Sequence, residues 1–454
     1  MGTTQQLATF VQQTTYEALP VAAVARAKQA IIDTIGTTLA GATDPAGDIL
    51  TRYVTSLGGA PQASILGKGV RTSAPQAALV NGTMAHAYDY DDVNWSMSGH
   101  PSVPLVPALL AVGEAQGVSG QALLTAYILG FEVEAKIGRG INPTHYQLGW
   151  HATATLGVLG AAVAVAKLLR LSAAHTAVAL GLAASMASGL RQNFGTMTKP
   201  LHPGQAAMHG VMAATLAQMG FTADPDILEA PFGFARLFTG GTYALEPMTA
   251  TLGQPYDVLE PGIVVKQYPC CAFTHRALDG MLALVEKHQL TADEVEAVEC
   301  VVSQLASDVL IHPRPTTGLE GKFSLEYCLA AALLDRQAGL GQFTDAMVQR
   351  PQVQAFLPRI SRHTHPLSAQ QAGANGEELP VMVTVKLRDG RKYTQQVEVP
   401  KGHPDLPLSE AELHAKFRTC AGLVLPPAHV ERALEMLVHL EQQDSIAPCM
   451  ALLA

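Results

Sequence analysis

The chain has 454 residues and a formal net charge of −9, and only 15% of its residues are charged. Apolar residues make up 48% of the chain but aromatic residues only 6%, so small and aliphatic side chains supply most of the apolar content. Disordered chains combine low hydrophobicity with high net charge, and nucleic-acid binders need an excess of basic residues. The composition excludes both classes. The length allows two or three domains and a large core.

Residues 152–169 raise the question of a membrane span, because the segment ATATLGVLGAAVAVAKLL is nearly long enough to cross a bilayer. It consists mostly of Ala, Gly and Thr and carries Lys167, so we predict a buried helix of a soluble protein instead. The N-terminal sequence MGTTQQLATF lacks the basic and apolar regions of a secretory signal. We therefore expect a cytoplasmic protein with no membrane partner and no nucleic-acid partner.

Helical patterns dominate the first 264 residues. Segments of helical length with amphipathic or Ala-rich patterns cover residues 22–40, 121–137 and 172–190. No acidic residue occurs between His151 and Lys199. Helices with so little charge must be covered on nearly all sides, so we predict an all-helical domain over residues 1–264.

The composition shifts after residue 264. Residues 295–303 alternate like a strand, and residues 381–399 contain two alternating runs joined at Asp389-Gly390, the strongest short-range signal for a β-hairpin. With helical segments between them, these runs predict a smaller α+β domain over residues 265–400. A capping box at residues 409–412 opens C-terminal helices over residues 401–454, which we expect at the domain junction. The sequence leaves open which domain they join.

The six cysteines all lie in the second half of the chain, and no two of them form a CxxC pair. Their spacing fits neither a zinc knuckle nor a disulfide framework. We therefore predict buried, reduced thiols at Cys270, Cys271, Cys300, Cys328, Cys420 and Cys449.

Histidine and lysine side chains gather in loops punctuated by Gly and Pro, where functional groups concentrate. Desolvation at the edge of an apolar stretch would lower the pKa of Lys199 unless an anion compensates, so a carboxylate is a natural partner. Histidine can transfer protons near neutral pH, and lysine can stabilise developing negative charge. These loops suit a small polycarboxylate substrate and contain His86, Asp89, Asp91, Asp92, His100, His151, Lys199, His202, Lys266 and His275.

Other classes of site find less support. A metal site would use His86, Asp89, Asp92 and His100, but no HExxH or HxH spacing accompanies them. A serine hydrolase would need a GxSxG elbow, and nucleotide binding would need a GxGxxG or P-loop signature; neither occurs. A metal-dependent hydrolase and a non-catalytic polycarboxylate-binding protein remain as alternatives, and we predict no metal and no cofactor.

Six motifs in a fixed order resemble the MmgE/PrpD family: HAYDYDD, GHPS, GWHATAT, NFGTMTKPLHPG, KQYPCCAFTH and KFSLEYCLAAALLD. That family includes 2-methylcitrate dehydratase, cis-aconitate decarboxylase and iminodisuccinate epimerase, and the resemblance extends from about residue 5 to residue 445. It implies a mainly α fold with a large all-helical domain and a smaller α+β lid domain, and an active site in the cleft between them. It also implies a homodimer and chemistry without metal or organic cofactor.

The resemblance also implies roles for individual residues. Catalytic roles fall to His100, His151, Lys199 and Tyr327, while Asp89, His202, Lys266 and His275 are expected to bind substrate. One departure matters: in the decarboxylase branch a threonine follows the DxDD run, whereas this chain has Val93. The resemblance implies a cofactor-independent lyase for a small di- or tricarboxylate, of the 2-methylcitrate dehydratase or cis-aconitate decarboxylase type. An isomerase of the iminodisuccinate epimerase type is the alternative, because all three reactions transfer a proton beside a carboxylate.

Overall fold

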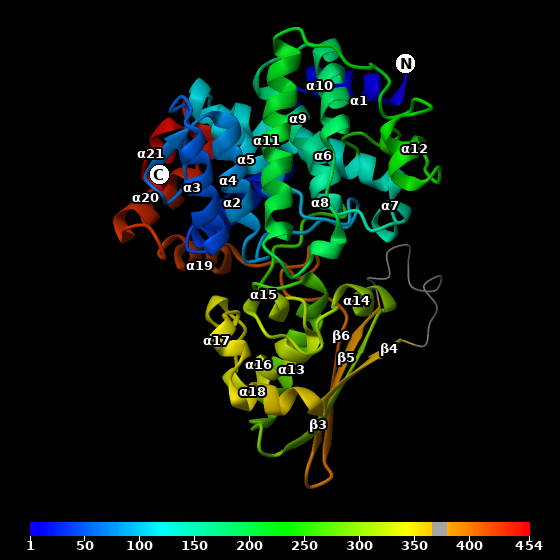
Figure 1. Cartoon of the computed structure of the whole chain (residues 1–454), viewed down its shortest axis with the longest axis vertical. Helices are drawn as coiled ribbons and strands as arrows, with labels where there is room; N and C mark the ends of the chain where they lie inside the picture. The colour runs from blue at the N-terminus through cyan, green and yellow to red at the C-terminus, as the bar shows by residue number, and fades with distance from the viewer. Residues whose placement is uncertain (366–378) are drawn as a thin grey trace. The chain divides into compact units, whose positions relative to one another are not determined.

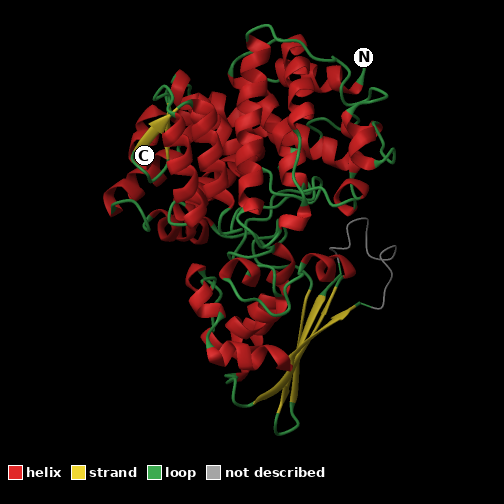
Figure 2. Ribbon diagram, in the orientation of Figure 1, coloured by secondary structure: helices red, strands yellow, loops and turns green. Residues whose placement is uncertain are grey.

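The computed structural model describes residues 1–365 and 379–454. The chain forms two compact units, each described by itself below. Unit 1 comprises Met1–Gln192, Pro200–Val265 and Ser409–Ala454, and unit 2 comprises Asn193–Lys199 and Lys266–Leu408. Helices predominate, and the strands occur in two small sheets, which confirms the predicted mainly α fold with a smaller α+β part (Figure 2).

Unit 1 is a helical assembly with one short antiparallel hairpin, β1 (Ala63–Ile65) and β2 (Val70–Thr72). Its helices are α1 (Thr3–Gln13), α2 (Val21–Gly41), α3 (Pro45–Leu57), α4 (Ala74–His86), α5 (Ser102–Gln116), α6 (Gly120–Ile141), α7 (Thr144–Gln147), α8 (Ala152–Thr155), α9 (Gly157–Leu168), α10 (Ala173–Met186), α11 (Thr198–Gln218), α12 (Phe234–Thr239), α19 (Glu410–Ala421), α20 (Pro427–Val438) and α21 (Ala447–Leu453). The first two residues of α11 are counted with unit 2.

The core of unit 1 forms where α6 packs beside α9 (Figure 1). The side chain of Ser119 caps α6 by accepting a hydrogen bond from the amide of Ala122. A Cβ atom on Gly130 would lie 2.7 Å from the Cβ of Ala164, so the absence of a side chain lets the two backbones approach closely. The small residues of the apolar segment therefore serve helix packing.

The segment 152–169 is buried but is not one continuous helix, because it is divided between α8 and α9 at Leu156. The charge of Lys167 is satisfied by the carbonyl oxygens of Val11, Gln12 and Thr14, at 2.6–3.1 Å. Among the described residues, no helix combines the length and apolar character needed to cross a membrane.

The C-terminal helices α19 to α21 belong to unit 1, a question that the sequence left open. The predicted capping box is present, with Ser409 and Glu412 bonded reciprocally. In α19, Lys416 forms a buried ion pair with Asp33 of α2, with Nζ 2.6 Å from the carboxylate. Nζ also donates to the carbonyl of Tyr90 at 2.8 Å. This contact joins the C-terminal helices to the loop that follows α4.

Unit 2 packs helices on a four-stranded sheet with strand order β4-β3-β5-β6 (Figure 2). The predicted hairpin is β5 and β6, antiparallel, with Val381 opposite Val397. The pairing of β3 with β4 is parallel, which was not predicted. The elements are α13 (His275–His288), β3 (Val295–Val302), α14 (Gln304–Val309), α15 (Gly318–Gly321), α16 (Leu325–Asp335), α17 (Asp345–Val348), α18 (Pro351–Phe356), β4 (Ile360–Thr364), β5 (Val381–Leu387) and β6 (Lys392–Val397).

Candidate functional site

Four histidines from separate motifs lie together in unit 1. His86 ends α4, His100 precedes α5, His151 precedes α8, and His202 lies in α11. The ring centroids are 4.4 Å apart for His86 and His100, 6.0 Å for His86 and His151, and 5.1 Å for His151 and His202. The structure therefore brings three sequence-predicted residues together, His100, His151 and His202, and adds His86.

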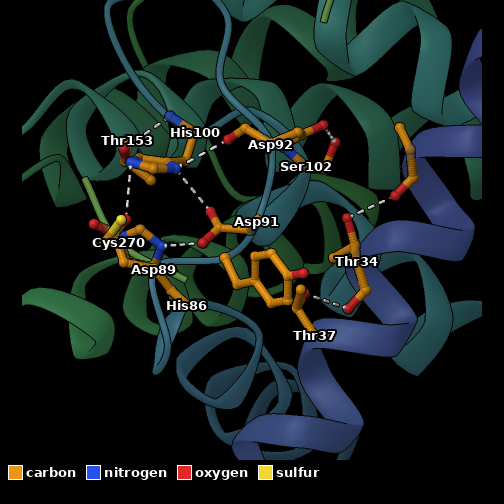
Figure 3. A network of polar contacts seen from close by, with 12 residues as sticks. Thr34, Thr37, His86, Asp89, Asp91, Asp92, His100, Ser102, Thr153 and Cys270 are labelled. Carbon is orange, nitrogen blue, oxygen red and sulfur yellow. Dashed lines mark hydrogen bonds and ion pairs between the residues drawn. The ribbon is translucent and has the colours of Figure 1, made fainter. Parts of the chain in front are cut away.

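Asp91 joins two of these histidines (Figure 3). Its Oδ1 lies 2.8 Å from Nδ1 of His86, and its Oδ2 lies 2.8 Å from Nδ1 of His100. An ionised carboxylate only accepts hydrogen bonds, so His86 carries a proton on Nδ1 and donates it to Oδ1, while Oδ2 lies at ion-pair distance from His100. Burial alone would raise the pKa of Asp91, but the charges and hydrogen bonds of His86 and His100 hold it well below its usual value. Asp91 is thus an ionised carboxylate inside the unit.

The position of His100 is fixed from both sides of its ring. Nδ1 also lies 2.9 Å from the carbonyl oxygen of Asp92, a second acceptor. Neutral His100 therefore has its proton on Nδ1, and Nε2 is the atom that can exchange a proton. Nε2 lies 3.5 Å from Oδ1 of Asp89. Asp89 has φ 51°, a left-handed conformation that is uncommon outside glycine.

Asp92, the next carboxylate along the chain, has a different role. Its side chain accepts from the amide of Ser102 at 3.3 Å and from the Ser102 hydroxyl (Figure 3). That hydroxyl also contacts Oη of Tyr127 at 2.7 Å. Burial raises the pKa of Asp92 to about 8. Because Ser102 begins α5, Asp92 fixes the start of that helix next to His100. The metal-site alternative named Asp92 as a ligand; the structure groups Asp91 instead with His86, Asp89 and His100.

The Nδ1 atoms of His151 and His202 face each other. Their Nδ1 atoms are 2.9 Å apart, so one must donate a proton and the other must accept it. The amide of His151 donates to the carbonyl of Gly189 at 3.0 Å. Gly189 has φ 141°, and a Cβ atom there would lie 2.7 Å from the Cβ of Ala154, so glycine is required for this close approach.

Lys199 lies in unit 2 among aromatic rings. Its Nζ is 5.3 Å from the ring centroid of Phe194 and 5.2 Å from that of Phe323, within cation–π range. The side chain is buried, with 4% of the residue exposed. A buried ammonium group between apolar rings is a strong potential partner for an anion, which is the role that the sequence suggested.

The other predicted residues of unit 2 are also buried. Lys266 is fully buried, and His275 begins α13 with Nε2 3.3 Å from the carbonyl oxygen of Cys270. The ring of Tyr268 stands edge-on to His275, with centroids 5.2 Å apart. All six cysteines fall in the described part of the chain; each is buried, and none is joined in a disulfide there.

Tyr327 is placed differently from the expectation of a catalytic hydroxyl. Its Oη donates to the carbonyl oxygen of Gln342 within unit 2, and its ring packs 5.7 Å from Phe343. Burial raises the pKa of the phenol, so it stays protonated. Because its proton already has an acceptor, these contacts favour a structural role for Tyr327.

Sequence reasoning did not foresee that Asp91 joins His86 to His100. Both His86 and Asp91 stand in the HAYDYDD motif and were expected in a site for a polycarboxylate, with His86 also named as a ligand in the metal-site alternative. A usable signal existed: a helix that ends at His86 turns the chain back within a few residues, so a nearby acidic residue can reach the same ring.

Comparisons with known proteins agree with this description. The family model for the MmgE/PrpD N-terminal domain matches residues 5–246, and that for the MmgE/PrpD C-terminal domain matches residues 268–442. The chain is 29% identical to a cis-aconitate decarboxylase of Homo sapiens over an alignment of 441 residues, which covers 95% of this chain and 90% of the relative. It is 28% identical to a cis-aconitate decarboxylase of Aspergillus terreus over an alignment of 476 residues, which covers 100% of this chain and 96% of the relative.

Proposed function

Because this chain belongs to the MmgE/PrpD family, we propose that it is a lyase for a small di- or tricarboxylate, with decarboxylation of cis-aconitate as the first candidate reaction. Support for the candidate substrate comes from the relatives, which are cis-aconitate decarboxylases similar over nearly their whole length. The structural observation that carries the proposal is His100, held by Asp91 with its proton-exchanging nitrogen at a defined position.

The chemistry needs a proton donor at one carbon. When a carboxylate beside an alkene leaves as CO₂, the C–C bond breaks and its electron pair stays on carbon as an allylic carbanion. The two end carbons of the allyl system share that electron pair, and one of them must then take up a proton. His100 can donate it from Nε2, because Asp91 and Asp89 on either side stabilise the imidazolium form. The histidine returns to its charged form by taking a proton from solvent.

The second histidine pair provides another proton-transfer group. His151 and His202 share one proton between their Nδ1 atoms, so His151 can give or receive a proton without a change in the geometry of the pair. We assign His151 as the second catalytic residue and His202 as the residue that orients it. Lys199 is assigned to a substrate carboxylate, and no step of this scheme calls for a metal or an organic cofactor.

An epimerase-type reaction is the second candidate, because it needs the same proton-transferring side chains. At the position where the decarboxylase branch has a threonine, this chain has a buried valine whose backbone pairs with Val264 at 2.9 Å. This departure weakens the transfer of the specific substrate from the decarboxylase branch. Epimerisation would use the same groups, with one histidine removing the proton beside a carboxylate and another returning it to the opposite face.

One experiment separates the candidates. The enzyme is incubated in D₂O with cis-aconitate, 2-methylcitrate, citrate or iminodisuccinate, and each reaction is followed by NMR. Loss of CO₂ with deuterium on the product indicates decarboxylation, alkene formation indicates dehydration, and deuterium exchange with inversion indicates epimerisation. Thermal stabilisation by one of these compounds without turnover would indicate a binding protein and contradict the proposal.

Variants test the assignment of the residues. His100→Ala and Lys199→Ala should each abolish turnover of the substrate so identified, while circular dichroism remains that of the wild type. Undiminished turnover in both variants would contradict the assigned site, whichever reaction the protein catalyses.

A further inference from the structure

Four side chains in unit 1 place metal-binding atoms close together. His86, Asp89, Asp91 and His100 each offer one nitrogen or oxygen, and these atoms all lie within 4.8 Å of one another. We call this set the His/Asp cluster. His86, Asp89 and Asp91 are buried, and the side chain of His100 is 12% exposed. The cluster is therefore largely shielded from solvent, and His100 is its most accessible member.

We propose that the His/Asp cluster binds one Zn²⁺ ion and that the bound ion inhibits the enzyme. Two imidazole nitrogens with two carboxylate oxygens form a four-ligand set of the kind that zinc accepts. Calcium prefers about six to eight oxygen ligands, and magnesium prefers an octahedron of oxygen ligands that includes several retained waters. The ligand chemistry therefore favours zinc over these two cations.

The distances require little rearrangement. With zinc–ligand bonds of about 2.0–2.1 Å, ligand atoms at tetrahedral corners lie about 3.3–3.4 Å apart. Nε2 of His100 is already 3.5 Å from Oδ1 of Asp89. The contact of Asp91 Oδ1 with Nδ1 of His86, at 2.8 Å, would lengthen by about 0.5 Å as the N–H···O hydrogen bond gives way to coordination, whereas Oδ2 would stay beside Nδ1 of His100, on the other side of that ring from the ion.

The charge also balances. Two ionised carboxylates with two neutral imidazoles carry a charge of −2, which one Zn²⁺ ion neutralises inside a largely buried site. Histidines that bind zinc commonly donate their other ring N–H to a carbonyl or carboxylate. The contact of His100 Nδ1 with the carbonyl oxygen of Asp92, at 2.9 Å, is an outer contact of this kind.

The inhibitory part of the proposal rests on the proposed function, whereas the binding part does not. A zinc ion bound to His100 occupies the nitrogen that exchanges the proton. The bound enzyme would keep its fold but lose turnover, and removal of the ion with a chelator would restore activity.

The test uses the full chain after treatment with a chelator and dialysis. Zn²⁺ is titrated by calorimetry, and Co²⁺ is titrated as a spectroscopic probe of four-coordinate geometry. We expect one ion per wild-type chain. His86→Asn and Asp91→Asn should each weaken binding by roughly 100-fold, the upper range for loss of even an outer contact. Asp89→Asn, a milder change, provides a third test if either variant fails to fold.

His151→Asn is the matched control, because His151 is a buried neighbour of the cluster but not one of its four ligands. It should bind zinc like the wild type while losing turnover. Equal zinc affinity in the wild type and in the His86 and Asp91 variants would overturn the proposal. Single-site binding that leaves turnover intact would support the metal site but contradict the assignment of His100 as the proton donor, so the two failures are distinguishable.

Discussion

Asp91 orients His100 for proton transfer, and this role depends on the charge of the Asp91 side chain as well as on its shape. Asp91→Asn keeps the size of the side chain but offers an amide N–H₂ group to one of two rings that each need an acceptor. We expect kcat to fall about 10²–10⁴-fold, the range for loss of an oriented acid–base histidine, with a smaller change in KM. Steady-state kinetics on the identified substrate measures both.

The control for that change is Asp405→Asn. Asp405 also lies near a histidine, with its carboxylate 3.5 Å from Nδ1 of His403, but its side chain is 77% exposed. Its kcat should match the wild type. If Asp91→Asn and Asp405→Asn show the same kcat, Asp91 does not act through His100.

The burial of His145 should make the stability of the folded protein depend on pH, independently of catalysis. Its Nε2 contacts Oγ1 of Thr155 at 2.7 Å, and burial lowers the pKa of the ring from 6.5 to about 4. Between these values the unfolded chain binds a proton that the folded chain does not, so stability falls as the pH falls. The free energy of unfolding should therefore drop by about 2 kcal/mol between pH 7 and pH 5 from this residue alone.

The measurement compares the wild type with His145→Gln. Urea unfolding at pH 7 and at pH 5 should show a smaller loss of stability in the variant, because glutamine does not titrate. An equal loss in both proteins would mean that His145 is protonated inside the fold.

At the scale of elements, the position of His202 depends on how closely α11 crosses α4. A Cβ atom on Gly204 would lie 2.3 Å from the carbonyl oxygen of Leu79, and one on Gly82 would lie 2.8 Å from the Cα of Gly204. Gly204→Val should therefore push the helices apart. It should destabilise unit 1 by at least about 1–3 kcal/mol and reduce activity, because His202 lies two residues away on the same helix.

Gly341→Ala in unit 2 is the matched control, since a Cβ atom there would meet nothing within 4 Å. Thermal unfolding of the two variants measures the difference. A Gly204→Val protein with the stability of the wild type would show that α4 and α11 are not packed through these glycines.

Local patterns predicted much of the fold at this scale. The hairpin at Asp389-Gly390 and the capping box at Ser409 both depend on a few neighbouring residues, and both are present. The parallel pairing of β3 with β4 depends on residues about 60 positions apart, and no local pattern specifies it. The break at Leu156 also left no signal, because Ala and Gly suit both a continuous and an interrupted helix.

The same distinction applies to the candidate site. The sequence identified His100, His151 and His202 as residues of interest, since it placed them in loops that interrupt apolar helices. For His202 that placement was wrong, because the residue lies within α11. It could not tell Asp91 from Asp92, because the two adjacent carboxylates differ only in the side of the loop to which they point. That choice is made by tertiary contacts, with two rings on one side and the start of α5 on the other.

At the scale of the whole molecule, the assembly expected from the family is a homodimer. Unit 1 carries exposed apolar side chains on and after α11, at Met212, Met219 and Phe221, although most apolar residues of the unit are buried. A partner chain would cover such a surface. Light scattering after size-exclusion chromatography should give twice the chain mass of 47.8 kDa. A mass equal to one chain over a wide concentration range would contradict the prediction.

The division of the chain between the units has a consequence for biosynthesis. Unit 1 needs residues from both ends of the chain, since Lys416 of α19 pairs with Asp33 of α2 and the amide of Gly67 donates to the carbonyl of Leu453. A ribosome adds these C-terminal residues after the whole of unit 2 has been made. Asp33 therefore cannot pair with Lys416 until translation is nearly complete. All residues of unit 2 have been synthesised while unit 1 still lacks its C-terminal helices. A nascent chain stalled before residue 409 should expose the apolar face of α2 to chaperones.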